Sequence, residues 1–108
     1  MSDSTASAQF LQIAEIDRVL HEPSRLGIVA LLYMLDSADF IFVMNQTGMT
    51  WGNLSSHLSK LEEAGYLEIE KAFKGKRPTT NLRLTPAGRE SFKEYVQRMR
   101  KLFTDLPV

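Results

Sequence analysis

Apolar residues recur at helical spacing in several stretches of the 108-residue chain. Leu54, Leu58 and Leu61 fall at positions i, i+4 and i+7, so they share one face of a helix over residues 50–64. Thr50 is a good N-cap for this helix, and Gly65 supplies a stop after it. The pattern therefore predicts a well-delimited helix with one apolar face.

Two more helices are predicted before it. Residues 10–20 are amphipathic and end at His21-Glu22-Pro23, which predicts a short surface helix. From Pro23 to Leu35 the chain is apolar on nearly every face. That pattern is typical of a helix at the centre of a small domain.

The segment between these helices and residue 50 is ambiguous. Residues 36–39 predict a turn, and residues 40–44 are all bulky and apolar, which could form a buried strand. We predict a short helix instead, because Asp39 can cap its start and Gly48 can end it.

Two stretches alternate between apolar and polar residues, as half-buried strands do. They cover residues 66–73 and 81–85, and the basic residues 74–80 between them contain Gly75 and Pro78. The pattern predicts a hairpin whose two strands are joined by a basic loop.

Thr85 and Pro86 suit the N-cap and first position of a last helix, which should run to about residue 103. The expected order is three helices, a turn, the helix over residues 50–64, a strand, a basic loop, a second strand and a last helix. This order predicts an α+β, mainly α, fold: a winged helix-turn-helix with a two-stranded β-hairpin wing and a long C-terminal helix.

Composition fits one domain, with 44% hydrophobic and 24% charged residues. We assign residues 10–108 to this domain and residues 1–9 to a disordered tip. The tip is not a secretory signal, and the longest apolar run, residues 28–35, is far short of the ~20 residues that span a bilayer. We expect a soluble, cytoplasmic protein without membrane contact.

The absence of cysteine excludes disulfides and thiolate chemistry.

The net charge of zero conceals a polarised distribution. Residues 1–59 hold six acidic and two basic residues, whereas residues 60–108 hold seven acidic and eleven basic. From residue 71 to residue 89 there is no acid. This stretch includes Lys71, Lys74, Lys76, Arg77 and Arg83. A local basic patch of this kind favours a polyanionic partner.

The helix over residues 50–64 carries short polar side chains opposite its leucines. Serine is a mediocre helix former, so a merely solvated face would more often carry Glu, Gln, Lys or Arg. We interpret the face as a DNA contact surface and the hairpin loop as a grip on phosphates or the minor groove. The predicted DNA-binding residues are Thr50, Asn53, Ser55, Ser56, His57, Ser59, Lys60, Lys74, Lys76, Arg77 and Thr79.

Three assignments leave alternatives open. His57 lies at the border of the polar face, so it could contact a phosphate or make a structural hydrogen bond. Trp51 lies toward the semi-buried side, where we expect it to pack in the core or in an interface. A solvated serine-rich helix followed by a flexible hairpin is the alternative to DNA contact.

The predicted last helix has more apolar residues than a small wing needs to cover, and they could pack on the first helix of the same chain or of a partner. We expect them to form a two-fold dimer interface, which would place two recognition helices in successive major grooves. The expected interface residues are Phe10, Ile13, Phe92, Tyr95, Val96, Met99, Leu102 and Phe103.

Catalytic and metal-binding patterns are not found. Glu62 and Glu63 are adjacent, so they project about 100° apart on a helix and cannot form a catalytic pair. The sequence has no phosphate-binding glycine loop and no nucleophile with a base. We expect no enzyme activity, cofactor or metal.

Three stretches resemble the compact winged-helix transcriptional regulators of the MarR/ArsR-like group: residues 50–66, 71–80 and 84–89. The ending Leu-Glu-Glu-Ala-Gly-Tyr of the first and Leu-Thr-Pro-Ala-Gly-Arg in the last carry the resemblance. It implies a sequence-specific regulator that binds double-stranded DNA, usually as a homodimer. The lack of cysteine departs from thiol-based metal sensors. The short chain leaves little room for the region that houses ligands in MarR proteins, so no effector is indicated.

A second function, from another class, is a winged helix used as a protein-interaction module. Its contact surface would be the region around Trp51 and Phe73. A continuous positive stripe across helix and loop favours DNA, whereas an uncharged apolar patch there favours a protein partner.

Overall fold

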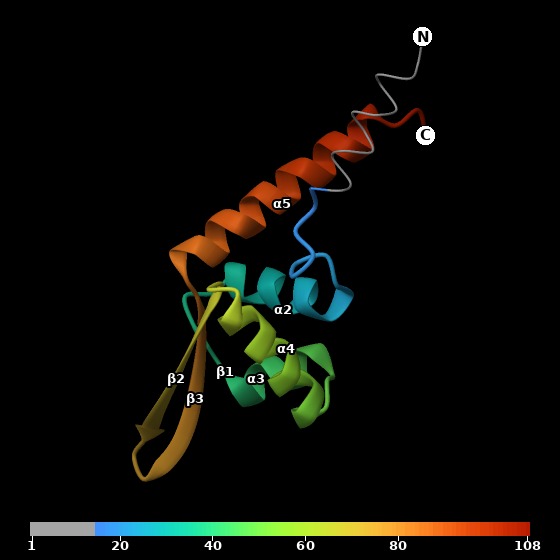
Figure 1. The fold of residues 1–108 in the computed structure, drawn as a ribbon. Coiled ribbons are helices and arrows are strands. Elements are labelled where there is room, and N and C mark those ends of the chain that lie inside the picture. Colours follow the sequence, from blue (N-terminus) through green and yellow to red (C-terminus); the bar gives the residue numbers. More distant parts are fainter. Residues whose placement is uncertain (1–14) are drawn as a thin grey trace.

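The computed structural model describes residues 15–108 as a bundle of helices closed by a small sheet (Figure 1). The sheet is antiparallel with strand order β1-β3-β2. The predicted α+β, mainly helical winged helix-turn-helix with a long C-terminal helix is confirmed. The elements are α2 (Pro23–Tyr33), β1 (Ala38–Asp39), α3 (Phe40–Thr47), α4 (Trp51–Glu63), β2 (Leu67–Lys74), β3 (Arg77–Leu84) and α5 (Pro86–Asp105).

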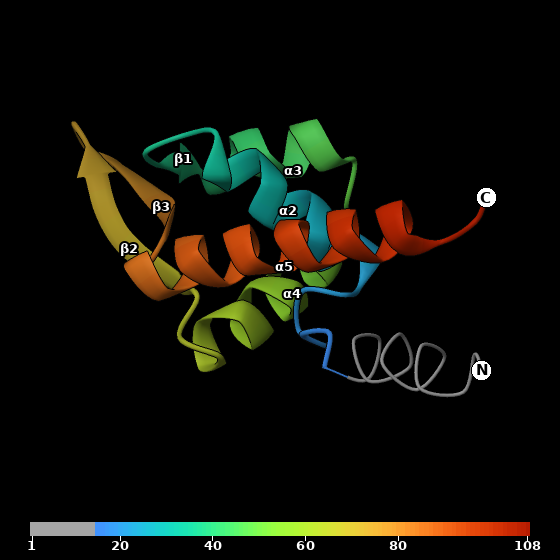
Figure 2. The same ribbon diagram turned by 90° about the horizontal axis from the view of Figure 1, so that it is seen from above.

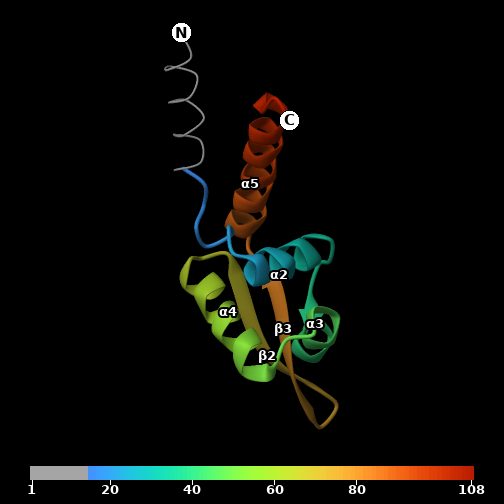
Figure 3. The same cartoon turned by 90° about the vertical axis from the view of Figure 1, so that its right-hand side faces the viewer.

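The helices and the hairpin point in different directions from a shared core. Seen from above, α2 lies between α3 and α4 (Figure 2). The β2–β3 hairpin, which we call the wing, extends to one end of the molecule, and α5 extends to the other (Figures 1 and 3). The wing therefore lies on the side of the body away from the C-terminal end of α5. No helix within residues 15–108 is both long enough and apolar enough to cross a membrane.

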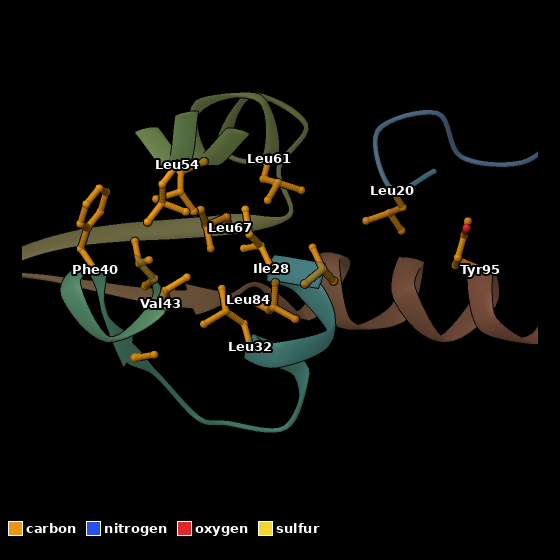
Figure 4. Close-up of a cluster of buried hydrophobic side chains, with 14 residues drawn as sticks. Leu20, Ile28, Leu32, Phe40, Val43, Leu54, Leu61, Leu67, Leu84 and Tyr95 are labelled. Carbon is orange, nitrogen blue, oxygen red and sulfur yellow. The ribbon is translucent and has the colours of Figure 1, made fainter. Parts of the chain in front are cut away.

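The core is built from the leucines that the sequence pattern singled out and from their partners in α2 and the sheet. Leu54 and Leu61 of α4 are fully buried, and so are Ile28 of α2 and Leu82 of β3 (Figure 4 shows the cluster). Each such side chain contributes about 1.5–3 kcal/mol through removal of apolar area from water. The apolar face of α4 is thus committed to the fold, which leaves its other face outward.

The predicted helix over residues 10–20 is wrong in its second half. Residues 15–20 form turns, and residues 10–14 lie outside the described part of the chain. Asp17 explains the difference, because its Oδ1 accepts hydrogen bonds from the backbone N–H groups of Val19 and Leu20, at 2.9 and 3.2 Å. An aspartate that bonds to its own neighbours in this way competes with helix formation.

The region before α4 mixes a confirmed helix with a strand that was not predicted. Asp39 caps α3, accepting from the N–H of Ile41 at 2.7 Å, and Gly48 ends it with φ 69°. The predicted turn over residues 36–39 is wrong in its second half, because Ala38 and Asp39 pair with Leu82 and Asn81 as β1. A strand of two residues exists only because β3 offers it an edge.

The end of α4 is closed by backbone hydrogen bonds that require glycine. Gly65 has φ 81°, its N–H donates to the carbonyl of Glu62 at 2.9 Å, and the N–H of Tyr66 donates to Leu61 at 3.0 Å. This is the Schellman arrangement, in which a left-handed residue satisfies the last carbonyls of the helix. It turns the chain from α4 into β2.

The start of α5 is fastened to the same turn. Thr85 caps α5 by accepting from the N–H of Gly88 at 2.9 Å, while its hydroxyl donates to the carbonyl of Gly65 at 2.6 Å. Its own N–H donates to the carbonyl of Tyr66 at 3.0 Å. A Cβ atom at Gly88 would lie 2.2 Å from that same carbonyl oxygen. The two motifs behind the family resemblance therefore form one structural unit.

Replacing Gly88 by alanine should destabilise the fold. The new methyl group would overlap backbone atoms of Tyr66, which cannot move aside like a flexible side chain, so we expect a loss of about 3 kcal/mol in the free energy of unfolding. Urea denaturation measures this loss. The matched control is Gly27→Ala, a helical glycine with no atom within 4 Å of the added Cβ, which should be neutral or slightly stabilising. Equal stability of the two variants would contradict the proposed role of Gly88.

Candidate nucleic-acid interface

The outer face of α4 carries small polar side chains. Thr50 caps the helix by accepting from the N–H of Asn53 at 3.2 Å. The only acidic residues of α4, Glu62 and Glu63, lie in its last turn. Five of the predicted contact residues on this element are exposed: Thr50, Asn53, Ser56, Ser59 and Lys60. The helix thus offers hydroxyl, amide and ammonium groups without bulk or opposing charge over most of its length.

The other two predicted contact residues on α4 are half-buried. Ser55 faces the wing and His57 faces α2. Nδ1 of His57 lies 3.3 Å from Nη1 of Arg25 and 3.7 Å from Oε2 of Glu22. The structural hydrogen bond that was one interpretation of His57 is therefore observed, with Arg25 as the partner. The other interpretation, contact with a phosphate, stays a prediction.

Glu22 and Arg25 were not singled out from the sequence, yet they tie the recognition helix to α2. Glu22 caps α2 by accepting from the N–H of Arg25 at 2.8 Å. The side chain of Arg25 donates from Nε to the carbonyl of Val19 at 2.7 Å. The backbone N–H of Arg25 is the largest cause of the lowered pKa of Glu22, and the neighbouring charges of His57 and Arg25 lower this pKa further. The cluster holds α4 at a fixed angle to α2.

The wing is a tighter hairpin than predicted. The loop expected over residues 74–80 is wrong, because β3 already begins at Arg77 and only Gly75 and Lys76 form the turn. Gly75 has φ 66° while Lys76 does not have a positive φ, as in hairpin turns with glycine at the first central position. Lys74, Lys76 and Arg77 are exposed at this tip. Thr79 is half-buried opposite Ala72 in the strand pairing.

The strand register gives the wing two chemically different faces. Side chains alternate between faces along a strand, and directly paired residues share a face. The face that continues from the core carries the pairs Leu67–Leu84, Ile69–Leu82, Lys71–Thr80 and Phe73–Pro78. The opposite face carries Glu68–Arg83, Glu70–Asn81, Ala72–Thr79 and Lys74–Arg77.

One basic residue of the patch is neutralised. Nη2 of Arg83 lies 3.5 Å from Glu68 and 3.7 Å from Glu70, so its charge is shared with two carboxylates on its own face. The expectation of five uncompensated bases is therefore wrong for Arg83. The remaining cationic groups concentrate at the tip and at Lys71.

A groove separates α4 from the wing. Its volume is about 290 Å³, and its walls come from α3, α4, β2 and β3. Trp51 lies at its edge with 60% of its surface exposed and its ring 4.3 Å from that of Phe40. Trp51 thus packs on Phe40 with one side only and is not a core residue, while its expected place in an interface stays a prediction.

Lys71 and Thr80 also line this groove, and sequence reasoning missed both as site residues. Lys71 was noted only as part of the basic patch. The alternation of residues 66–73 could have indicated the position of Lys71, because it places Lys71 on the same face of the strand as Ile69.

The residues of α5 that were expected at a dimer interface differ in how deeply they are buried within the chain. Tyr95 is buried, with its hydroxyl 2.8 Å from Nδ1 of His21, and Leu102 is buried as well. Phe103 is 59% exposed. Phe92, whose ring lies 5.1 Å from that of Tyr33, is half-buried together with Val96 and Met99. Phe10 and Ile13 lie outside the described residues.

Hydrogen bonds fix two tyrosines near the base of α5. Burial raises the pKa of Tyr95, and it raises the pKa of Tyr66, whose hydroxyl also donates to Asp17. Both hydroxyls therefore remain protonated at neutral pH. Within residues 15–108, no three His, Cys, Asp or Glu side chains converge on a point where they could hold a metal ion.

Comparisons with known proteins agree with this geometry. A family model described as a winged helix DNA-binding domain matches residues 24–103. An uncharacterized protein of Methanocaldococcus jannaschii, MJ0432, is 35% identical over 85 residues, covering 79% of this chain and 92% of that protein.

Solved structures of regulators have the same fold. A transcriptional regulator homologue from Pyrococcus horikoshii OT3 gives a TM-score of 0.85 at 28% identity, over 94% of this chain and 99% of that one. The PcaV transcriptional regulator from Streptomyces coelicolor gives 0.71 at 16% identity, over 92% and 72%. A MarR-family regulator from Silicibacter pomeroyi gives 0.64 at 19% identity, over 95% and 68%. The predicted likeness to MarR-type regulators is confirmed at the level of the fold, and the ArsR part stays a prediction.

Removing the charge of Glu22 should flatten the response of stability to acid. A lowered pKa means that the folded state favours the carboxylate, so its stabilisation is complete above the ordinary value of 4.5 and is lost as the pH falls below it. Wild type should therefore lose more stability than Glu22→Gln between neutral pH and strongly acidic pH, as followed by urea denaturation.

The exposed residue Glu63 provides the control for this comparison, since no described ion pair involves it. Glu63→Gln should follow the wild-type profile. A Glu22→Gln profile parallel to wild type would show that the cluster does not stabilise the fold through this charge.

Proposed function

Because the chain belongs to the winged helix DNA-binding domain family, we propose that it is a sequence-specific transcriptional regulator that binds double-stranded DNA through α4 and the wing. The observation that carries the proposal is the outer face of α4, which is exposed, polar and without acid until its last turn. An α-helix about 10–12 Å across fits a major groove about 12 Å wide. Asn53, Ser56 and Lys60 reach outward from this helix and are proposed to contact bases.

The wing supplies the second contact. Its exposed tip carries Lys74, Lys76 and Arg77, and these cations are suited to phosphates beside the recognition groove or to a minor groove. Phosphate contacts contribute affinity for any duplex, whereas contacts from α4 to base edges distinguish one sequence from another. The two elements therefore have separable effects on binding.

Neutralising the wing tip should weaken binding to every duplex. The double variant Lys76→Ala, Arg77→Ala removes two cations, so the slope of log affinity against log salt should become shallower by about 2. Fluorescence anisotropy of labelled duplexes over a range of salt concentrations measures this slope. An unchanged slope would contradict the role of the wing tip.

Asn53→Ala provides the contrasting variant for this measurement. Removing an amide that reads a base should leave the salt slope unchanged and reduce the preference for the selected site by about 1–3 kcal/mol. If Asn53→Ala instead weakened binding equally to all duplexes, its contact would be to the backbone.

We also propose that the chain acts as a homodimer assembled through α5. Phe92, Val96, Met99 and Phe103 follow one another at helical spacing and form a stripe that is half-buried to exposed. A two-fold pair would bring two copies of α4 to one side of a duplex, one helical turn apart.

Placing a charge on this stripe should break the dimer. Phe103→Asp removes a contact worth about 1.5–3 kcal/mol from each copy, so the dimer dissociation constant should rise at least about 100-fold. Analytical ultracentrifugation measures this constant. The matched control is Phe73→Asp on the wing, where the phenylalanine is even more exposed, at 74%, and the assembly state should not change. A monomeric wild type at micromolar concentration would contradict the proposal.

The exposure of Trp51 and Phe73, 60% and 74%, keeps a protein-interaction module as a second candidate function. This candidate differs from the first in one measurable respect, since it predicts no binding to duplex DNA at any salt concentration.

A further inference from the structure

The groove between α4 and the wing lies where DNA geometry requires a strand to pass. If α4 occupies a major groove and the wing tip reaches the adjoining minor groove, the sugar-phosphate strand that separates the two grooves must run between them. In the structure this space is not closed by side chains, but forms a groove of about 290 Å³. The position of the groove alone therefore makes it a candidate site for a DNA strand.

The lining of the groove has the chemistry of a phosphate site. Hydroxyl groups come from Ser55 and Ser59 on α4 and from Thr80 on β3, and an ammonium group comes from Lys71 on β2. No acidic side chain is among the described residues that line it. Hydroxyls and lysine are among the usual partners of phosphate oxygens.

The charge of Lys71 is available for such a contact. The acidic residues of β2, Glu68 and Glu70, project from the other face of the wing, where both lie near Arg83. Within residues 15–108, no carboxylate lies within ion-pair distance of Lys71. Lys71 is exposed and paired across the strands with Thr80, so the two polar groups lie side by side on the face toward α4.

Trp51 gives the groove an apolar wall. Its indole packs at 46° on the ring of Phe40, and its remaining surface is open to the groove and to solvent. An indole held in this way suits the apolar side of a deoxyribose. It is also the only tryptophan of the chain, so its fluorescence reports on this one place.

Building on the proposed DNA-binding function, we infer that this groove seats the sugar-phosphate backbone of the bound duplex, with Lys71, Ser59 and Thr80 binding one phosphate and Trp51 packing against the adjacent sugar. Lys71 becomes an anchor that fixes the register of α4 on the DNA. Ser55 and Ser59, predicted from the sequence as DNA contacts, then contact the backbone rather than the bases. Asn53, Ser56 and Lys60 are then the residues that contact bases.

The test uses Lys71→Gln in the full chain, since glutamine retains much of the side chain and removes its charge. Affinity for the selected site and for unrelated duplexes should fall by the same factor, roughly threefold to tenfold, and the salt slope should become shallower by about one. The control is Lys93→Gln on α5, the helix that extends away from the wing (Figure 1), and it should match wild type. Circular dichroism verifies that each variant is folded.

A second measurement locates the phosphate. Duplexes that carry one neutral methylphosphonate at successive positions should bind wild type less well at one phosphate in each half-site, and Lys71→Gln should be insensitive at that same phosphate. In wild type, acrylamide should quench Trp51 less at saturating duplex than in the free protein. Loss of the methylphosphonate effect in the variant is specific to a direct contact and would not follow from a structural role of Lys71.

The outcomes separate this inference from the function on which it rests. If wild type prefers its site while Lys71→Gln keeps the wild-type salt slope and methylphosphonate profile, the strand does not run through the groove and the inference is overturned. Unchanged quenching of Trp51 at saturation would overturn it in the same way. If wild type binds no duplex with sequence preference, the proposed function itself fails, and this inference fails with it.

Discussion

The contact between Gly88 and the carbonyl of Tyr66 determines how α4, the wing and α5 are placed relative to one another. The carbonyl belongs to the residue that joins α4 to β2, and it accepts a hydrogen bond from Thr85, the residue that joins β3 to α5. The beginning of β2 and the end of β3 are therefore joined at one point. Only glycine allows α5 to approach that point so closely, because a Cβ atom there would lie 2.2 Å from the oxygen.

Rigidity at this junction matters for a protein that holds DNA with two elements. A recognition helix can read bases only if its register is fixed by contacts elsewhere on the duplex. Here the wing is anchored to the end of α4 by Thr85, and the middle of α4 contacts α2 through His57, Arg25 and Glu22. Arg89 extends the same network by donating to the carbonyls of Tyr33 and Leu35 at 3.0 and 2.8 Å.

Features set by local chemistry were predictable from the sequence, and features set by a distant partner were not. The caps Asp39, Thr50 and Thr85 and the leucine face of α4 act within one or two helical turns, so pattern and residue type suffice. β1 was not predicted because its two residues form a strand only where β3 provides an edge. Pro78 and Gly75 suggested a loop, yet proline is tolerated in β3 there because β1 pairs only further along, at Asn81 and Leu82.

The same distinction holds for the candidate site. Helical periodicity alone indicates that Asn53, Ser56 and Lys60 face outward, and the structure agrees. It could not indicate that His57 meets Arg25, that Arg83 is neutralised by Glu68 and Glu70, or that Lys71 and Ser59 line one groove, because each depends on how separate elements pack.

Selection of bound sequences from a pool of random duplexes tests the central claim, that this chain reads DNA sequence as a two-fold pair, most directly. We expect enrichment of one inverted repeat with half-site centres about 10–10.5 base pairs apart, or a multiple of that spacing. A pool that stays random after repeated rounds with folded protein would contradict it.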